Sequence, residues 1–127
     1  MTQNEMKLRT KKFALRIINL VDNLPNTKPA NVIGHQLLRS ATSVGSNYRA
    51  VCRAKSAADF INKLSIVEEE ADESGYWLEL PSEGRIVRHE KLVALMEEAD
   101  EIVAIVVAAS KTSKERRNPK SQIPNPK

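Results

Sequence analysis

Two acidic clusters and two histidines are the residues of this sequence whose types suit metal chemistry. The clusters are Glu68–Glu73 and Glu97–Glu101, and the histidines are His35 and His89. A di-iron site in a helical bundle needs Glu-x-x-His on two helices, because its ligands must project inward together. Valine and isoleucine stand where those two glutamates would have to be, so neither histidine completes the motif. We therefore expect no metal site and interpret the acidic clusters as helix surface.

Nucleophilic chemistry has a single candidate, the lone cysteine Cys52. No histidine or other base stands near it in the sequence, and an isolated cysteine more often packs as a small apolar residue. The sequence has no phosphate-cradling glycine loop, no nucleophile elbow and no zinc-ligand spacing. We therefore expect a protein without catalytic activity or cofactor, and keep a carboxylate–metal enzyme as the least favoured alternative.

Cations suited to phosphate contacts are the strongest functional signal. Three groups of lysines and arginines, on the first predicted helix, at the end of the second and near the C-terminus, comprise Lys7, Arg9, Lys11, Lys12 and Arg16; Arg49, Arg53 and Lys55; and Lys111, Lys114, Arg116, Arg117 and Lys120. Such contacts bind nucleic acid with little sequence preference and weaken as salt rises. We expect these cations to bind RNA or DNA; a merely solvated basic face is the competing interpretation.

Charge is divided unevenly along the chain, whose net charge is +4. Residues 1–28 carry six basic and two acidic side chains, and residues 29–56 carry four basic and none acidic. Residues 57–84 carry one basic and eight acidic side chains, and residues 85–127 carry nine basic and six acidic. This division favours anionic partners at the basic faces, association of basic with acidic surfaces of the same protein, or both.

Two helices are predicted in the first half of the chain. The first begins at a capping box of Thr2 and Glu5 and ends at the turn Leu24–Pro29, since proline cannot continue a helix. Its apolar stripe, with the residues beside it, comprises Met6, Phe13, Ala14, Ile17, Ile18, Leu20, Val21 and Leu24. The second runs from about residue 29 to Arg53. Its seam, at helical spacings, comprises Ile33, Leu37, Ala41, Val44, Tyr48 and Val51.

The second predicted helix contains several small and polar residues in its interior. Those that we single out as a structural motif are Arg39, Ser40, Ser43, Gly45 and Asn47. A glycine inside a helix costs roughly 1 kcal/mol relative to alanine, so Gly45 indicates that another helix approaches closely. The polar side chains indicate packed polar contacts, with a solvated polar face as the open alternative. We also predict an ion pair, within one chain or between subunits, of Arg39 with Glu68, Glu70 or Glu73.

The second half of the chain predicts two more helices. The third begins at the capping-box-like segment Ser56–Asp59 and breaks at Pro81–Gly84. Its stripe comprises Ala57, Phe60, Leu64, Val67, Ala71, Ser74 and Leu78. The fourth runs from about residue 88 to about residue 114, with a stripe of Leu92, Leu95, Met96, Ala99, Ile102, Val103, Val106 and Ala109. Short connections between four long helices predict an all-α, antiparallel up-and-down four-helix bundle over residues 1–114. Residues 115–127 are predicted to be a disordered, basic, proline-rich tail.

Self-association is predicted from the segment Ile102–Ala109, which is apolar on all sides over eight residues. One side can enter the bundle core, while the other, near Ile105, needs cover from a second copy. Eight apolar residues are also far too few to span a membrane, and no signal-peptide core follows the N-terminus. We therefore expect a homo-oligomer in the cytoplasm.

A longer pattern within residues 32–80 resembles a known family. Its most specific parts are Gln36–Ser40, Ser43–Arg49, Asp59 with Phe60, Glu69–Glu73 and Tyr76–Leu80. This pattern resembles the four-helix bundle family known from intervening sequences in bacterial 23S rRNA genes. The chain departs from it after Leu80, where a proline replaces the aliphatic residue that family members often carry, so the end of the third helix is in question. A related bundle is the accessory protein of diversity-generating retroelements, a five-fold barrel with a basic surface that works with nucleic acid and a reverse transcriptase.

The resemblance implies more about fold than about function, because the family has no agreed activity. It implies a four-helix bundle assembled into a ring-like homo-oligomer, a pentamer, with RNA or DNA and a reverse transcriptase or another protein as further partners. Together with the charges, it leads us to expect a non-enzymatic oligomer that binds RNA or DNA with little sequence specificity. The alternative is a protein–protein adaptor or scaffold without a nucleic-acid role, whose acidic third helix docks a basic partner.

Overall fold

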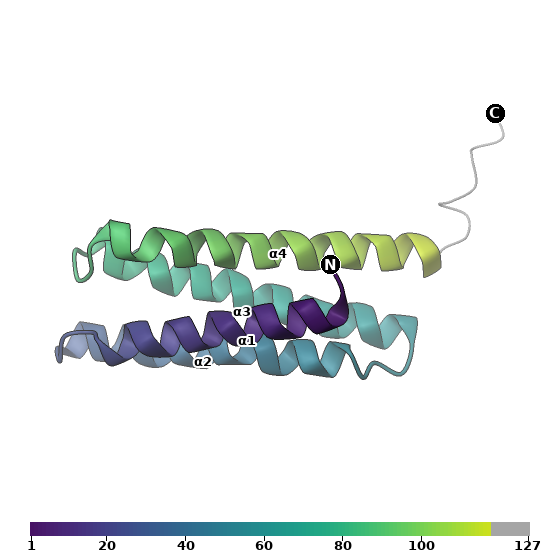
Figure 1. Ribbon diagram of the computed structural model, residues 1–127, viewed down its shortest axis with the longest axis horizontal. Coiled ribbons are helices and arrows are strands. Elements are labelled where there is room, and N and C mark those ends of the chain that lie inside the picture. The colour runs from purple at the N-terminus through teal and green to yellow at the C-terminus, as the bar shows by residue number, and fades with distance from the viewer. Residues whose placement is uncertain (118–127) are drawn as a thin grey trace, which may run out of the picture.

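Four helices in antiparallel succession make up the protein in the computed structural model, which describes residues 1–117 (Figure 1). They are α1 (Gln3–Asp22), α2 (Lys28–Val51), α3 (Ala57–Glu83) and α4 (His89–Arg117), and no strand occurs within the described part. Helix α2 packs against α1 and α3, and α3 packs against α4, whereas the seam between α1 and α4 is the least closely packed. The predicted all-α four-helix bundle is confirmed. None of the four helices is long and apolar enough to cross a membrane.

The starts of α1 and α3 follow the predicted capping signals. Thr2 Oγ1 accepts the Glu5 N–H at 3.1 Å, and the Glu5 carboxylate accepts the Thr2 N–H at 3.2 Å, which completes a capping box. These hydrogen bonds lower the pKa of Glu5, the bond from the Thr2 backbone first. At α3, Ser56 Oγ accepts the Asp59 N–H at 3.0 Å. Each contact satisfies backbone donors that a helix start leaves without a partner.

Helix α3 ends within the predicted segment Pro81–Gly84, but Pro81 itself does not end it. Pro81 is buried inside α3, and the helix continues to Glu83. A proline removes one helical hydrogen bond, but here it does so only in the last turn, and its carbonyl oxygen accepts the Ile86 N–H at 2.9 Å. The helix ends at Gly84, where a Cβ would lie 2.8 Å from the carbonyl oxygen of Leu80.

Two other helix ends differ from the predicted ones. Helix α2 ends at Val51, two residues before the predicted Arg53. Helix α4 continues to Arg117, so Glu115, Arg116 and Arg117 belong to a helix rather than to the predicted tail. The rest of that tail, with Lys120, lies outside the described residues.

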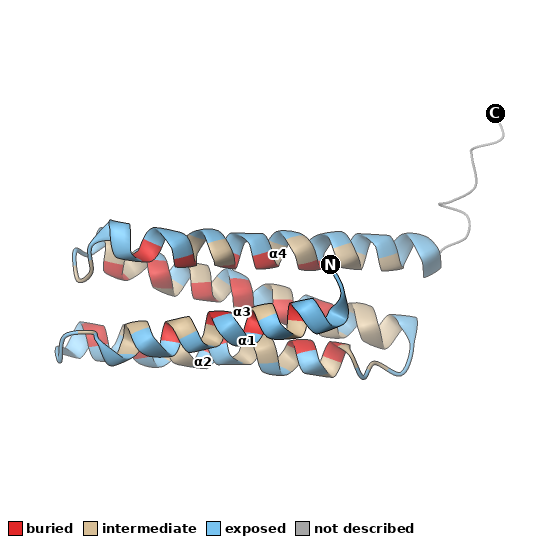
Figure 2. Ribbon diagram, viewed as in Figure 1, coloured by how far each residue is buried: buried red, intermediate tan, exposed pale blue. Residues whose placement is uncertain are grey.

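One apolar stripe from each helix forms the core (Figure 2). Its buried members are Met6, Phe13 and Ile17; Leu37, Ala41, Val44, Tyr48 and Val51; Leu64, Val67, Ala71 and Leu78; and Leu92, Leu95, Ala99, Ile102 and Val106. All of them belong to the predicted stripes. Fully burying a large aliphatic side chain contributes about 1.5–3 kcal/mol, so these stripes hold the bundle together. The stripes extend less far than predicted, since Ile18 is 45% exposed and Ala57 is exposed.

Candidate nucleic-acid interface

Cations from two helices gather around a hollow between α1 and α2. Lys7 and Lys11 of α1 and Arg49 of α2 line it, and the other residues of its wall and floor are Ala14, Thr42, Gly45 and Ser46. Its volume is about 280 Å³. Lys7 and Lys11 stand four residues apart, which places them on one side of α1. Within residues 1–117 none of the three cations forms an ion pair with an acid. This site, the α1–α2 hollow, therefore offers three free positive charges.

Helices α1 and α2 approach each other closely at Gly45, which lines the hollow. A Cβ on Gly45 would lie 3.6 Å from the backbone carbonyl of Thr10, so the α1 backbone rests against the glycine. Thr10 is fully buried, and its Oγ1 donates to the carbonyl oxygen of Met6 at 2.9 Å. No bulky side chain therefore separates the helices there. The close helix approach predicted from Gly45 is confirmed.

The predicted cations that follow α2 and those on the last turns of α4 lie at one end of the bundle, which we call the basic end. The antiparallel topology brings the start of α1, the end of α2 and the end of α4 together there (Figure 1). The exposed cations on the last turns of α4 and just after α2 are Lys111, Lys114, Arg116 and Arg117, and Arg53 and Lys55. Groups that are far apart in the sequence thus share one end of the molecule.

Arg9 is removed from this set by an ion pair. Its Nε lies 2.6 Å and its Nη2 2.9 Å from the two carboxylate oxygens of Glu98, and Nη2 lies 3.3 Å from Glu101. The hydrogen bonds that the Arg9 guanidinium donates to Glu98 raise its pKa further above its ordinary value. Arg9 therefore joins α1 to α4 in the structure, and its charge is already neutralised.

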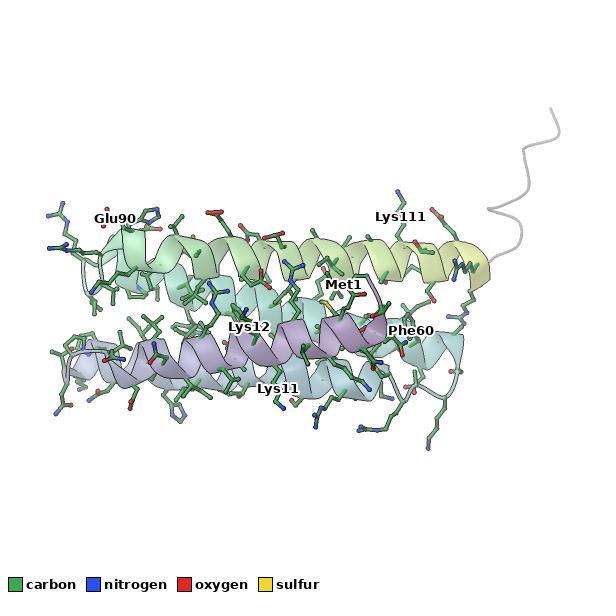
Figure 3. The ribbon with its side chains drawn as sticks, in the orientation of Figure 1. Met1, Lys11, Lys12, Phe60, Glu90 and Lys111 are labelled. Atoms are coloured by element: carbon green, nitrogen blue, oxygen red, sulfur yellow. The ribbon has the colours of Figure 1, made fainter. Side chains whose placement is uncertain are left out.

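Lys12 and Arg16 face away from the α1–α2 hollow. They line a groove of about 570 Å³ between α1 and α4, the α1–α4 groove, together with Leu15, Asn19, Leu20, Asn23, Lys91, Ala94 and Leu95. Figure 3 shows Lys12 on the side of α1 that faces α4 and Lys11 on the side that faces α2. The first predicted group of cations therefore divides among two sites and one ion pair. Lys91, which the sequence analysis did not single out, belongs to the groove because α4 runs antiparallel to α1.

Ile105, the predicted interface residue, is half-buried and packs against the core. It also lines a hollow of about 400 Å³ at the basic end, with Met1, Phe60 and Ala109 among its neighbours (Figure 3). Val107 is the more exposed aliphatic residue of the same segment, at 43%. Ile105 is therefore partly covered by its own chain.

The residues considered for metal or nucleophilic chemistry make contacts with other residues of the bundle. Over residues 1–117 no group of three or more histidine, cysteine, aspartate or glutamate side chains could hold a metal ion. His89 Nδ1 lies 2.9 Å from Ser82 Oγ, and Cys52 packs half-buried against the core. Burial, with a smaller contribution from Cys52, raises the pKa of Tyr48 to about 12. Tyr48 is therefore a neutral phenol in the physiological range.

The sequence and the fold are similar to those of known proteins. The family model described as 23S rRNA-intervening sequence protein matches residues 2–108. The chain belongs to the 23S rRNA-intervening sequence protein family. A crystal structure from Bacteroides thetaiotaomicron, described as a protein with unknown function from the S23 ribosomal protein family, is 39% identical with a TM-score of 0.80. The match covers 87% of this chain and 99% of that one. No curated protein matches the chain. The resemblance of residues 32–80 to this family is confirmed.

In this 23S rRNA-intervening sequence protein the α2 motif holds the helices together. Arg39 pairs with Glu70 at 3.3 Å and with Glu73, so the predicted ion pair between α2 and α3 is confirmed, without Glu68. The fully buried Ser40 Oγ lies 3.0 Å from Ser74 Oγ across the same interface.

The other motif residues act within α2 or against α1. Asn47 Nδ2 donates to the carbonyl oxygen of Ser43 at 2.8 Å, within α2. Gly45 packs against the backbone of α1, as described above. The packed polar contacts predicted for the motif are confirmed at Arg39 and Ser40. The signature stretch of α2 thus stabilises the bundle, and the cations around it remain available to a ligand.

Proposed function

We propose that this 23S rRNA-intervening sequence protein is a non-enzymatic homo-oligomer of the cytoplasm that binds RNA or DNA through the α1–α2 hollow and the basic end. The observation that carries the proposal is the gathering of Lys7, Lys11 and Arg49 around one hollow. Lysine and arginine without acidic partners attract the phosphate backbone, which dominates the affinity of proteins for nucleic acid. Hydroxyl groups of Thr42 and Ser46 in the same wall can add hydrogen bonds to phosphate oxygens.

The arrangement favours binding with little sequence preference. A protein reads the base sequence of a nucleic acid with side chains that reach base edges in one of its grooves. The cations of the hollow instead lie on two helices that pack against each other. Tyr76 is the exposed aromatic residue in the described part of the chain, and it lies on α3, away from the hollow. Base stacking on the hollow is therefore not expected, and duplex or structured RNA or DNA is the fitting ligand.

Assembly is needed for useful affinity. Three phosphate contacts per protomer correspond to a slope of log K against log salt of only about −3, which implies weak binding at physiological salt. An oligomer repeats the hollow by symmetry, and several weak sites on one particle act at a raised effective concentration. The family resemblance suggests a ring of five copies, with a reverse transcriptase or another protein as a further partner.

The test is a fluorescence-anisotropy titration of structured RNA and duplex DNA against salt. A triple variant, Lys7→Gln, Lys11→Gln and Arg49→Gln, should weaken binding by tenfold or more and flatten the salt dependence, at unchanged helix content. The matched control removes the same charge from the other end of the bundle, through Lys28→Gln, Arg85→Gln and Arg88→Gln, and should change binding little. Absence of binding by the intact protein at low salt would favour the adaptor without a nucleic-acid role. Equal losses in both triple variants would move the interface away from the hollow.

A further inference from the structure

We propose that the α1–α4 groove of one protomer receives the outer face of α3 from the next copy, so that the copies join head to tail. This inference rests on the oligomer of the proposed function and names the two surfaces that build it. A second copy is the occupant that the charges of both surfaces favour.

The α1–α4 groove is apolar at its floor and basic at its rim. Leu15, which is 57% exposed, Leu20 and Leu95 supply the apolar surface. Lys12 and Arg16 stand on the rim, with Lys91 opposite on α4. None of these three cations has an ion-pair partner within the described chain. Glu98, which lines a neighbouring pocket with Lys12 and Arg16, is already paired with Arg9, so the rim keeps its positive charge.

The outer face of α3 has the complementary character. Ile66 and Tyr76 are 44% and 52% exposed on it. Exposed acids at helical spacing surround them, and they are Glu69, Asp72, Glu79 and Glu83. In the part of the chain that the structure describes, none of these four forms an ion pair, whereas Glu70 and Glu73 are engaged by Arg39. We call this surface the α3 ridge; it presents two apolar anchors within a field of free negative charge.

The two surfaces also match in length. Ile66 and Tyr76 stand ten residues apart, about 15 Å along a helix that rises 1.5 Å per residue. The α1 side of the groove runs from Lys12 to Asn23, about 16 Å by the same rise. The Tyr76 ring is held edge-on against Trp77, with centroids 5.1 Å apart and planes at 71°. A ring with few free torsions docks at a low entropic cost, and tyrosine brings a polar tip that suits the asparagines of the groove.

Like surfaces cannot pair in this way. Two copies of the groove would place Lys12 and Arg16 of one against the same cations of the other, and two ridges would place acid against acid. Groove on ridge is therefore the favoured contact, and it joins different surfaces of the two copies. Such a heterologous contact builds a closed ring when the rotation between copies closes. Because α1 and α3 lie diagonally in the bundle, each copy can use both surfaces at once and leave the α1–α2 hollow open.

Sedimentation velocity at tens of micromolar protein tests this contact with charge reversals. A groove variant carries Lys12→Glu and Arg16→Glu, and a ridge variant carries Glu69→Lys and Asp72→Lys. Each alone should weaken self-association by about 30-fold or more, because the reversal places like charges against each other across the contact. Both pairs together in one chain should restore the assembly. A mixture of the groove variant with the ridge variant offers the original contact and the reversed contact, both between unlike copies, and should recover assemblies in which the two variants alternate.

The matched control reverses Lys7 and Lys11 to glutamate. These residues have the same spacing on α1 as Lys12 and Arg16 but line the α1–α2 hollow, so the oligomer should persist. Tyr76→Ala provides a variant without charge reversal, in case a reversed pair disturbs the Arg9–Glu98 contact. It should weaken assembly, whereas Tyr76→Phe should preserve it. Circular dichroism verifies the fold of each variant.

The outcomes separate this inference from the proposed function. Oligomers that survive the groove, ridge and Tyr76→Ala changes would overturn the docking while leaving the oligomer in place. A monomeric wild-type protein would overturn both the docking and the assembly, and would leave the groove to an acidic helix of another protein. If the variants dissociate as expected but the intact oligomer binds neither RNA nor DNA, the docking stands and the nucleic-acid role fails.

Discussion

The ion pair between Arg9 and Glu98 is the contact that closes the seam between α1 and α4, and its strength can be measured by a double-mutant cycle. We consider Arg9→Gln, Glu98→Gln and the variant that carries both changes. Each glutamine keeps most of the side chain and removes the charge. The interaction free energy is what remains when the two single losses are subtracted from the double one.

The geometry sets the expected size. Two N–O distances of 2.6 and 2.9 Å make the pair bidentate, and the side chains are only 23% and 14% exposed. Fully exposed pairs contribute about 0.2–1 kcal/mol, and hydrogen bonds to charged groups about 1.5–3 kcal/mol. This pair stands between those cases, so we expect a coupling of about 1–2 kcal/mol. For a chain of this length that corresponds to roughly 3–8 °C in Tm. Glu101, whose side chain is 63% exposed, should add little.

Urea unfolding followed by circular dichroism measures the four free energies, at low and at high salt. The control is Arg88→Gln just before α4, which removes an exposed arginine without an ion-pair partner in the described chain and should cost less than about 0.5 kcal/mol. A coupling below about 0.3 kcal/mol would refute the reasoning. It would mean that water solvates Arg9, and that its charge is available to phosphate after all. With the pair intact, Arg9→Gln should leave nucleic-acid binding unchanged as long as the bundle is folded.

Three further predictions concern packing, pH and the basic end. Gly45→Leu should destabilise the bundle by about 1–3 kcal/mol through overpacking against Thr10. Gly45→Ala should be neutral or stabilise by up to about 1 kcal/mol, because a Cβ there would sit 3.6 Å from the neighbouring helix. An unchanged Tm for the leucine variant would contradict the overpacking. The hydrogen bond from Lys63 lowers the pKa of Asp59, so its stabilisation should be complete above the unfolded value of about 3.9 and lost as pH falls through the lowered pKa. Urea unfolding of Asp59→Asn between pH 2.5 and 7 should therefore show a deficit that shrinks in acid, and a constant deficit would exclude the contact. Cutting the chain after Ser113 should weaken RNA and DNA binding in anisotropy titrations without unfolding the bundle, since the last fully buried side chain of the described residues precedes it by seven residues. Unchanged binding would show that the end of α4 does not contact the ligand.

The local features of this protein were predictable from the sequence. Helix periodicity is a relation between residues three or four apart, so the buried stripes of α2 and α4 follow from it. The caps at Thr2 and Ser56 depend on an acid three residues later and are equally local. The pair of Arg39 with α3 was predictable because a basic helix is followed directly by an acidic one, so charge and topology agree.

Only the tertiary structure decided which distant groups meet. Arg9 and Glu98 stand 89 residues apart, and no periodicity relates them; the antiparallel return of α4 along α1 does. The same return brings Lys91 to Lys12 and places the cations at the end of α4 at the same end of the bundle as those that follow α2. Pro81 illustrates the converse, because a residue that breaks helix interiors is accommodated where the next turn can use its carbonyl oxygen. Local rules describe how each helix forms, whereas the packing of four helices determines which charges are neutralised and which remain free to bind.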